Sequence, residues 1–265
     1  MMEEKKYDII TLGRSCIDLY SQSIGSPFNE IKGFDAFVGG SPLNIAVACS
    51  RLGLKTSLLT AIGNDKVGEF IVSFLKKENV DTNNIPIKNG SRTSAAVLGI
   101  QPPDNFPLVF YRDNAADSKL DIDDVISAKI PDYKILLISG TALNIEPSKS
   151  ATFYSIEVAN KNNVQVVLDL DFRADQWVDI RSYGLMIRAL IPGVKIAIGT
   201  EEEVLASTLL DTSQLKIKNQ QISSPKIKGN LEKSISQLIS LGLDVLIVKR
   251  GEKGVSIFKK NSDSQ

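Results

Sequence analysis

Short apolar runs alternate with segments of helical periodicity along most of the chain, and this alternation restricts the fold more than any other feature. Buried strands are predicted at 7–12, 56–62, 135–139, 164–170, 194–198 and 245–248. Residues 66–79 repeat apolar side chains at helical spacing, and residues 147–162 begin with a proline that suits a first helical turn. Strands that alternate with helices predict an α/β fold, with a mostly parallel sheet and helices on both faces.

Two segments interrupt this alternation and predict a second, smaller sheet. Residues 31–38 resemble an amphipathic strand, and residues 93–100 and 108–111 flank a turn-rich run, so that they resemble a hairpin. We expect segments near 14–38 and 92–112 to form a small β lid beside the core. The chain, 1–265, is then a single domain, and its polar stretch 211–229 is expected to be a surface insertion.

Composition excludes several classes of protein. The chain has no histidine, which excludes Ser-His-Asp and Cys-His catalysis and the common histidine-containing zinc sites. Lysine plus arginine and aspartate plus glutamate each number 31, so neither a nucleic-acid nor a membrane partner is expected. The only cysteines, Cys16 and Cys49, are expected to be buried spectators, and the charged N-terminus does not resemble a signal peptide. A cytoplasmic location is therefore predicted.

The turn Gly39-Gly40-Ser41-Pro42-Leu43-Asn44 is the most informative local motif. Two glycines let a backbone approach a ligand closely, and Pro42 suits the first turn of a helix whose N–H groups can hold ligand oxygens. Asn44 offers a donor and an acceptor from that turn. A tight strand-to-helix turn without a ligand explains the same residues equally well when the motif is considered alone.

The spacing of further motifs resembles the ribokinase-like, or PfkB, family of carbohydrate kinases. Asp18 follows the first predicted strand, the glycine turn matches the family's Gly-Gly-x-x-x-Asn signature, and Gly63-Asn64-Asp65-Lys66-Val67-Gly68 matches its Gly-x-Asp-x-x-Gly element. The resemblance covers nearly the whole chain, from Tyr7 to about Lys259. It implies a ribokinase-like fold with a small β lid.

Three downstream segments extend this resemblance. Residues 169–173 are similar to an Asp-x-Asn-x-Arg segment, and Thr200 and Glu203 lie where the family has Asn-x-x-Glu. A Gly-x-x-Gly turn, Gly251 to Gly254, follows the strand at 245–248, at a position that lies beside the nucleotide in the family. Without the family context, the acids at 201–203 are better explained as a helix N-terminus, and Lys249 and Arg250 as a basic surface turn.

The resemblance implies a division of roles along the chain, with ATP and Mg²⁺ as cofactors. The residues implied in substrate binding are Asp18, Gly39, Gly40, Asn44, Arg112, Asp171 and Arg173. The residues implied in nucleotide or phosphate binding are Thr200, Glu203, Lys249, Gly251 and Gly254, with Glu203 also near the metal. Family lids often pair across subunits, so a homodimer through the lid is an expectation of the same kind.

The substrate class is suggested by residues 110–117 and 199–203, which resemble the branch of the family that contains 5-dehydro-2-deoxygluconokinase. Its substrate is a keto sugar acid, and Arg112 could pair with the carboxylate of that acid. Kinases of 2-keto-3-deoxygluconate and fructokinase-like enzymes are the alternatives within the family.

The family's Gly-Ala-Gly-Asp segment, which supplies an anion hole and the aspartate base, has no counterpart here, because no Gly-x-Gly-Asp occurs. No residue is therefore assigned as catalytic, and the base is expected beyond Gln265. Three explanations stay open, of which we favour the first. The chain is a truncated piece of an active kinase, or a catalytically inactive sugar-binding or regulatory module, or a subunit whose site is completed by another chain.

Overall fold

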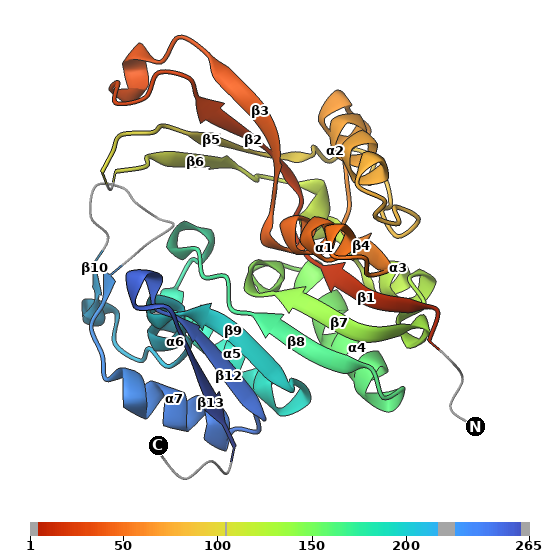
Figure 1. The fold of residues 1–265 in the computed structure, drawn as a ribbon, viewed down its shortest axis with the longest axis vertical. Helices are drawn as coiled ribbons and strands as arrows, with labels where there is room; N and C mark the ends of the chain where they lie inside the picture. Colours follow the sequence, from red (N-terminus) through yellow and green to blue (C-terminus); the bar gives the residue numbers. More distant parts are fainter. Residues whose placement is uncertain (1–4, 104, 217–225, 261–265) are drawn as a thin grey trace.

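The computed structural model describes residues 5–103, 105–216 and 226–260, and its largest element is a seven-stranded sheet in the order β13-β12-β9-β8-β7-β1-β4 (Figure 1). All neighbouring strands are parallel except β12 and β13, which are antiparallel. In sheet order the strands span Val255–Lys259, Val245–Lys249, Ile196–Thr200, Gln165–Asp169, Tyr133–Ser139, Tyr7–Leu12 and Thr56–Leu59. This is the predicted α/β architecture, shifted by one to three residues at several strand ends.

In the described part of the chain, five helices pack on one face of this sheet, and this helical layer lies behind the strands in Figure 1. They are α3 (Ile122–Ser127), α4 (Ser148–Lys161), α5 (Ile180–Leu190), α6 (Glu201–Ser207) and α7 (Leu231–Ser240). Alternate strand residues point into this layer, so that Ile10, Leu136 and Leu168 are fully buried in the largest hydrophobic core. The nearly continuous apolar strands follow from this double-sided burial.

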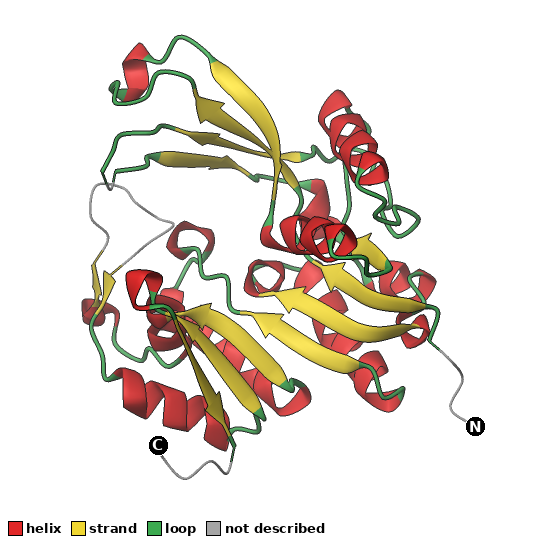
Figure 2. Ribbon diagram, viewed as in Figure 1, coloured by secondary structure: helices red, strands yellow, loops and turns green. Residues whose placement is uncertain are grey.

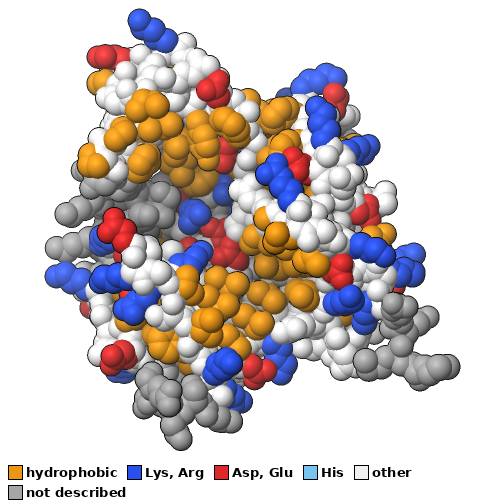
Figure 3. All heavy atoms as spheres, viewed as in Figure 1, with side chains coloured by type: hydrophobic (Ala, Val, Ile, Leu, Met, Phe, Trp, Pro, Cys, Tyr) orange, Lys and Arg blue, Asp and Glu red, His pale blue; other side chains and the backbone are white. Residues whose placement is uncertain are grey.

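The opposite face is covered unevenly. α1 (Ser41–Arg51) and α2 (Lys66–Lys77) pack over the end that contains β4, with Leu43, Ile71 and Leu58 in a second core. The other end carries Ile196, Ile198, Val245, Ile247, Val255 and Ile257 on one surface, because the strand register places them side by side. Hydrophobic side chains gather on this face in Figure 3. Helices on both faces are therefore confirmed, with one face covered only in part.

A separate four-stranded sheet, in the order β3-β2-β5-β6, stands above the carboxyl ends of the parallel strands (Figures 1 and 2). Its strands are β2 (Cys16–Ser21), β3 (Phe34–Gly39), β5 (Ser94–Leu98) and β6 (Leu108–Tyr111). The predicted hairpin pairs as expected, with Ala95 opposite Tyr111. The predicted strand at 31–38 begins later, at Phe34, and β2 was not predicted as a strand.

Asp65 joins the lid to the core, and this explains the second family motif. Its carboxylate caps α2 by accepting from the Gly68 backbone N–H at 2.8 Å, and it accepts from the N–H and hydroxyl of Thr93, each at 2.8 Å. Thr93 directly precedes β5, so a single carboxylate fixes both a helix start and the entry to the lid. Burial alone would raise the pKa of Asp65, but these hydrogen bonds outweigh it and lower the pKa.

The polar stretch 211–229 contains a short antiparallel pair, β10 (Leu215–Lys216) and β11 (Lys226–Ile227), and its central part, 217–225, lies outside the described residues. Within the described ranges, no helix combines the length and the hydropathy that crossing a membrane requires.

Candidate active site

A cavity of about 450 Å³ lies where the lid sheet faces the carboxyl ends of β1 and β8. Figure 3 shows this part of the molecule as a hollow that has both acidic and basic side chains at its floor. The lid contributes apolar side chains and Asp18 to the lining, and the core contributes further polar groups. The lining residues are Arg14, Asp18, Tyr20, Gly40, Ser41, Asn44, Ile45, Ala48, Ala96, Leu98, Leu108, Phe110 and Arg173. A small-molecule site of this size and mixed polarity suits a sugar-sized ligand.

The two glycines of the Gly39–Asn44 turn make room for the protein's own atoms. A Cβ on Gly39 would lie 2.2 Å from the Asp18 carboxyl group. A Cβ on Gly40 would lie 2.2 Å from the carbonyl oxygen of Arg14, and Gly40 has φ +104°, which L side chains rarely adopt. Gly39 therefore lets the end of β3 lie against the Asp18 side chain, and Gly40 lets the start of α1 lie against the Arg14 backbone.

Alanine at these glycines should have two different effects. Gly39→Ala displaces the Asp18 carboxylate, so we expect the affinity for the sugar ligand to fall about 10- to 100-fold with a small change in melting temperature. In Gly40→Ala the new Cβ would clash with the backbone of Arg14, and alanine rarely adopts the φ of Gly40. We therefore expect the free energy of unfolding to fall by ~2–4 kcal/mol. Gly53→Ala is the matched control, because Gly53 has φ +89° with open space around it. Calorimetric titration measures the affinity, and urea unfolding measures the stability. An unchanged affinity for Gly39→Ala would contradict the first expectation.

Asp18 and Asn44 reach the cavity from two different elements. Asp18 lies on β2, half-buried, and accepts a hydrogen bond from Cys16 Sγ at 3.0 Å. Asn44 lies in the first turn of α1 with an exposed side chain. Both line the cavity, and their role in substrate binding stays a prediction. Cys16 is fully buried, and burial raises its pKa, so it is not a reactive thiol; Cys49 is only half-buried.

Asp171, which is buried, and Arg173, which is partly exposed, form an ion pair just beyond β8. Arg173 Nη2 lies 2.9 Å from Asp171 Oδ1, and Ser139 Oγ and Thr141 Oγ1 donate to Asp171 Oδ2 at 2.8 and 3.2 Å. Burial alone would raise the pKa of Asp171. The charges of Arg173 and Arg14 and these hydrogen bonds have the larger, opposite effect, so its pKa lies below the usual value. Asp171 therefore stays ionised and positions Arg173, which lines the cavity.

Asp169, at the end of β8, is in the opposite electrostatic situation. It is 8% exposed and accepts a hydrogen bond from Ser41 Oγ. Burial and the negative charge of Asp171 raise its pKa to about 6. A carboxyl group that titrates near neutrality beside a candidate site can hold or release a proton there.

Asp169 should make the protein less stable as pH rises. Between the unfolded value of 3.8 and the folded value of about 6, the folded state holds a proton that the unfolded state has lost. The free energy of unfolding therefore falls across this window, by up to ~3 kcal/mol. Asp169→Asn should remove that fall and be more stable than wild type at pH 7.5 but not at pH 4.5. Urea unfolding at both pH values checks this, with Asp35→Asn as an exposed control; identical pH dependence in Asp169→Asn and wild type would contradict it.

Thr200 and Glu203 form a capping box at the start of α6. The Thr200 N–H donates to Glu203 Oε2 at 2.7 Å, and the Glu203 N–H donates to Thr200 Oγ1 at 3.2 Å. The Phe172 N–H donates to Glu203 Oε1 at 3.3 Å, and Arg173 Nη1 lies 3.9 Å from the same oxygen. The helix-start explanation is thus realised in the structure, and the cap also connects β9 to the Asp171–Arg173 segment.

Arg112 is not brought into the 450 Å³ cavity; it lines a separate cavity of about 250 Å³. Its Nη2 lies 2.6 Å from Asp117 Oδ2, with both side chains almost fully buried. Nε donates to the same oxygen at 2.9 Å, and Nη1 donates to Gln176 Oε1 at 2.7 Å. The predicted role as a partner of the substrate carboxylate does not follow from this arrangement, since internal acceptors already occupy the guanidinium.

The predicted nucleotide turn follows β12. Lys249 is exposed at the strand end, and Gly251 and Gly254 have φ +58° and +81° with open space beside each Cα. Arg250 Nε donates to Glu201 Oε1 at 2.7 Å, which joins this turn to the start of α6. The charge of Lys249 partly offsets the rise in the pKa of Asp169. The turn therefore belongs to the same sheet edge as the cavity.

Among the lining residues that the sequence did not indicate, Arg14 is the one that carries a charge. Arg14 lies between β1 and β2, is 6% exposed, and its guanidinium stacks over the Phe110 ring, 4.6 Å from the ring centroid. Its only signal in the sequence is a charged residue directly after Gly13, at the end of a buried strand. Because parallel strands direct their carboxyl ends to one edge, that position could have been considered a candidate.

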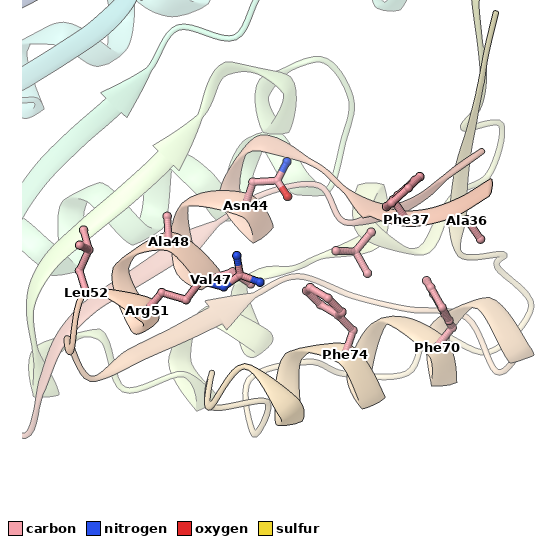
Figure 4. A pocket seen from close by; sticks show the side chains of 10 residues that line it. Ala36, Phe37, Asn44, Val47, Ala48, Arg51, Leu52, Phe70 and Phe74 are labelled. Carbon is pink, nitrogen blue, oxygen red and sulfur yellow. The ribbon is translucent and has the colours of Figure 1, made fainter. Parts of the chain in front are cut away.

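Another cavity, of about 620 Å³, is an apolar groove between β3, α1 and α2 (Figure 4). Phe37 from the lid and Phe70 and Phe74 from α2 line it, and Asn44 of α1 lines this groove as well as the 450 Å³ cavity. The groove has few polar groups, so it does not suit a sugar. Among the described residues, no cluster of three or more acidic or cysteine side chains could hold a metal ion.

Comparison with known proteins places this architecture. The pfkB family of carbohydrate kinases matches residues 6–265, which is nearly the entire chain. This chain belongs to that family. A 5-dehydro-2-deoxygluconokinase of Bacillus licheniformis is 32% identical over 262 residues, which cover 98% of this chain and 76% of the relative. A 5-dehydro-2-deoxygluconokinase of Geobacillus thermodenitrificans is 40% identical over 202 residues, which cover 76% of this chain and 60% of the relative.

Solved structures agree with this family assignment. An uncharacterized sugar kinase from Pyrococcus horikoshii, in complex with ATP, has a TM-score of 0.76 and 25% identity, covering 96% of this chain and 74% of that one. A fructokinase with bound ATP from Xylella fastidiosa has a TM-score of 0.80 and 21% identity, covering 97% and 76%. The predicted carbohydrate-kinase family and fold are thus confirmed, and this pfkB-family chain is a sugar kinase by relationship.

Proposed function

We propose that this pfkB-family protein uses ATP to phosphorylate a hydroxyl group of a keto sugar acid similar to 5-dehydro-2-deoxygluconate. The observation that carries the proposal is the cavity beneath the lid, where Asp18 from β2 and Asn44 from α1 line the same space as apolar lid residues. Carboxylate and amide groups bind sugar hydroxyls, and apolar walls cover a carbon skeleton. The names of the relatives at 32% and 40% identity support the substrate class.

The residues of the family motifs take separate roles in this proposal. Asp18 accepts hydroxyl hydrogens, Asn44 donates and accepts from the first turn of α1, and Gly39 and Gly40 position both. Arg173, held by Asp171 at 2.9 Å, faces the anionic groups of the substrate and of ATP in this proposal. Arg112 acts at a distance, because its pair with Asp117 fixes the segment that follows β6.

ATP is proposed to lie along the carboxyl ends of β9 and β12, beside Thr200, Lys249, Gly251 and Gly254. A related Escherichia coli structure assigned as a ribokinase II holds ATP and Mg²⁺. Mg²⁺ usually keeps several waters and binds through phosphates with one or two carboxylates, so a dedicated acidic cluster is not required. Glu203 fits as a carboxylate near such a metal, although both of its oxygens already accept backbone N–H groups. The metal would neutralise charge on the transferred phosphate.

A catalytically inactive sugar-binding module is the second candidate, because the sequence contains no Gly-x-Gly-Asp from which to assign the base. In that case the cavity binds the sugar acid and no phosphate is transferred.

Pairing of two subunits through the lid stays a prediction. Phe34, Phe37 and Tyr111 are exposed apolar residues on the lid sheet.

A coupled assay for ADP release distinguishes these functions. The 265-residue chain is incubated with ATP, Mg²⁺ and either 5-dehydro-2-deoxygluconate, 2-keto-3-deoxygluconate or fructose, and the binding of each sugar is titrated in parallel. Turnover of a keto sugar acid supports the kinase and excludes the inactive module. Binding of the acid without turnover supports the module, whereas preference for fructose contradicts the proposed substrate class.

A further inference from the structure

Arg14 is a buried cation whose hydrogen-bonding capacity is largely unused. Its Nε and Nη1 atoms are buried and have no hydrogen-bond partner among the described residues, although the residue lines the cavity. Leaving a buried charged donor without a hydrogen-bond partner is energetically unfavourable, because the water that it loses is not replaced. Stacking on Phe110 holds the plane of the guanidinium but satisfies none of its N–H groups.

The acidic residues near Arg14 are mostly committed to other cations. Asp171 pairs with Arg173 at 2.9 Å, and Asp117 pairs with Arg112 at 2.6 Å. Asp18 accepts from Cys16 Sγ and forms no ion pair with Arg14 among the described residues. The cavity therefore presents a carboxylate and a guanidinium that are not paired with each other, which is the complement of a ligand that carries both hydroxyl groups and an anion.

We propose that Arg14 binds the carboxylate of the substrate and thereby selects sugar acids over neutral sugars. The inference rests on the proposed function, because it concerns the same cavity and the same keto sugar acid. A carboxylate matches the planar N–H groups of a guanidinium and also compensates its charge, which a neutral hydroxyl cannot do. Arg14 takes over the role that the sequence suggested for Arg112, whose donors are already engaged by Asp117 and Gln176.

The competing explanation is electrostatic balance within the protein. Asp18, Asp117 and Asp171 are the acidic groups whose charges act on Arg14, and its positive charge offsets theirs. On that explanation, Arg14 contributes to the fold and to the orientation of Asp18 but does not distinguish an acid from an uncharged sugar. The two explanations differ in how the affinity depends on the charge of the ligand.

The test measures the affinity for 5-dehydro-2-deoxygluconate and for its carboxamide, which keeps the hydroxyl groups but lacks the charge. Calorimetric titrations compare wild type with Arg14→Gln, Arg14→Lys and the control Arg181→Gln, which removes an exposed arginine paired with Asp179. We expect Arg14→Gln to weaken binding of the acid about 30- to 150-fold, or ~2–3 kcal/mol at 1.4 kcal/mol per tenfold, and to change binding of the carboxamide less than threefold.

Other results would overturn either the role of Arg14 alone or the proposed function as well. Equal loss for acid and carboxamide in Arg14→Gln, or no loss for either, overturns the role of Arg14 while the proposed function stands. If wild type binds neither ligand, the proposed substrate class is wrong and the assignment of Arg14 fails with it. Should Arg14→Gln not fold, as judged by circular dichroism, Arg14→Lys decides: loss of acid affinity alone supports the proposal, and loss of both overturns it.

Discussion

Arg112→Ala is expected to lower the free energy of unfolding by ~3–5 kcal/mol, the usual cost of removing one partner from a buried ion pair. Asp117 would keep only its hydrogen bond from Ser94 and would remain as a buried, uncompensated charge. Gln176 and the Thr141 carbonyl would also lose a donor. Urea unfolding at pH 7.5 measures the change.

The control for this prediction is Arg181→Ala, which breaks an equally short but exposed pair with Asp179. Exposed pairs contribute at most ~1 kcal/mol, so this variant should unfold almost as wild type does. The double variant Arg112→Ala, Asp117→Ala should be no less stable than Arg112→Ala alone, because it removes the unpaired charge. An Arg112→Ala protein with wild-type stability and weakened acid binding would instead support the role that the sequence suggested for Arg112.

The fold was largely predictable because each parallel strand is buried on one face or both, and its sequence is therefore a run of mostly apolar residues. The lid was harder to predict. β2 contains Asp18, Tyr20 and Ser21 among apolar residues and is only partly buried, so it lacks the strict alternation that would indicate a strand. Its position depends on pairing with β3 and β5, which are contacts between segments distant in sequence.

The site was predictable where a motif requires a backbone geometry and less so where it requires a charge partner. Gly40 is needed because of its φ of +104° and the approach to the Arg14 carbonyl, and the sequence shows this as a paired glycine. The sequence also contains Asp117, five residues after Arg112, but not the information that the two are buried together. Arg14 is the opposite case. It belongs to no recognised motif, and only the fold shows that it lines a cavity.

Asp18→Asn should abolish most of the affinity for the sugar while leaving the fold intact. The amide has the shape of the carboxylate but lacks its charge, so two charge-assisted hydrogen bonds to sugar hydroxyls would be weakened, by ~2–4 kcal/mol together, or about 30- to 1,000-fold in affinity. The carboxylate is half-buried, its partners in the protein are the Cys16 thiol, a weak donor, and the Tyr20 hydroxyl, and an amide can still accept from both, so the melting temperature should change little.

Asp35→Asn is the matched control for this variant, because Asp35 lies on the neighbouring lid strand, opposite Tyr20, and its carboxylate is exposed and bound by Gln22 at 2.6 Å. Titration with 5-dehydro-2-deoxygluconate should show wild-type affinity for Asp35→Asn and a severe loss for Asp18→Asn. The same loss should be seen with the carboxamide, since Asp18 contacts hydroxyl groups rather than the acid. That contrast with Arg14→Gln assigns the two ends of the ligand separately, and an Asp18→Asn protein that binds the acid normally would remove Asp18 from the site.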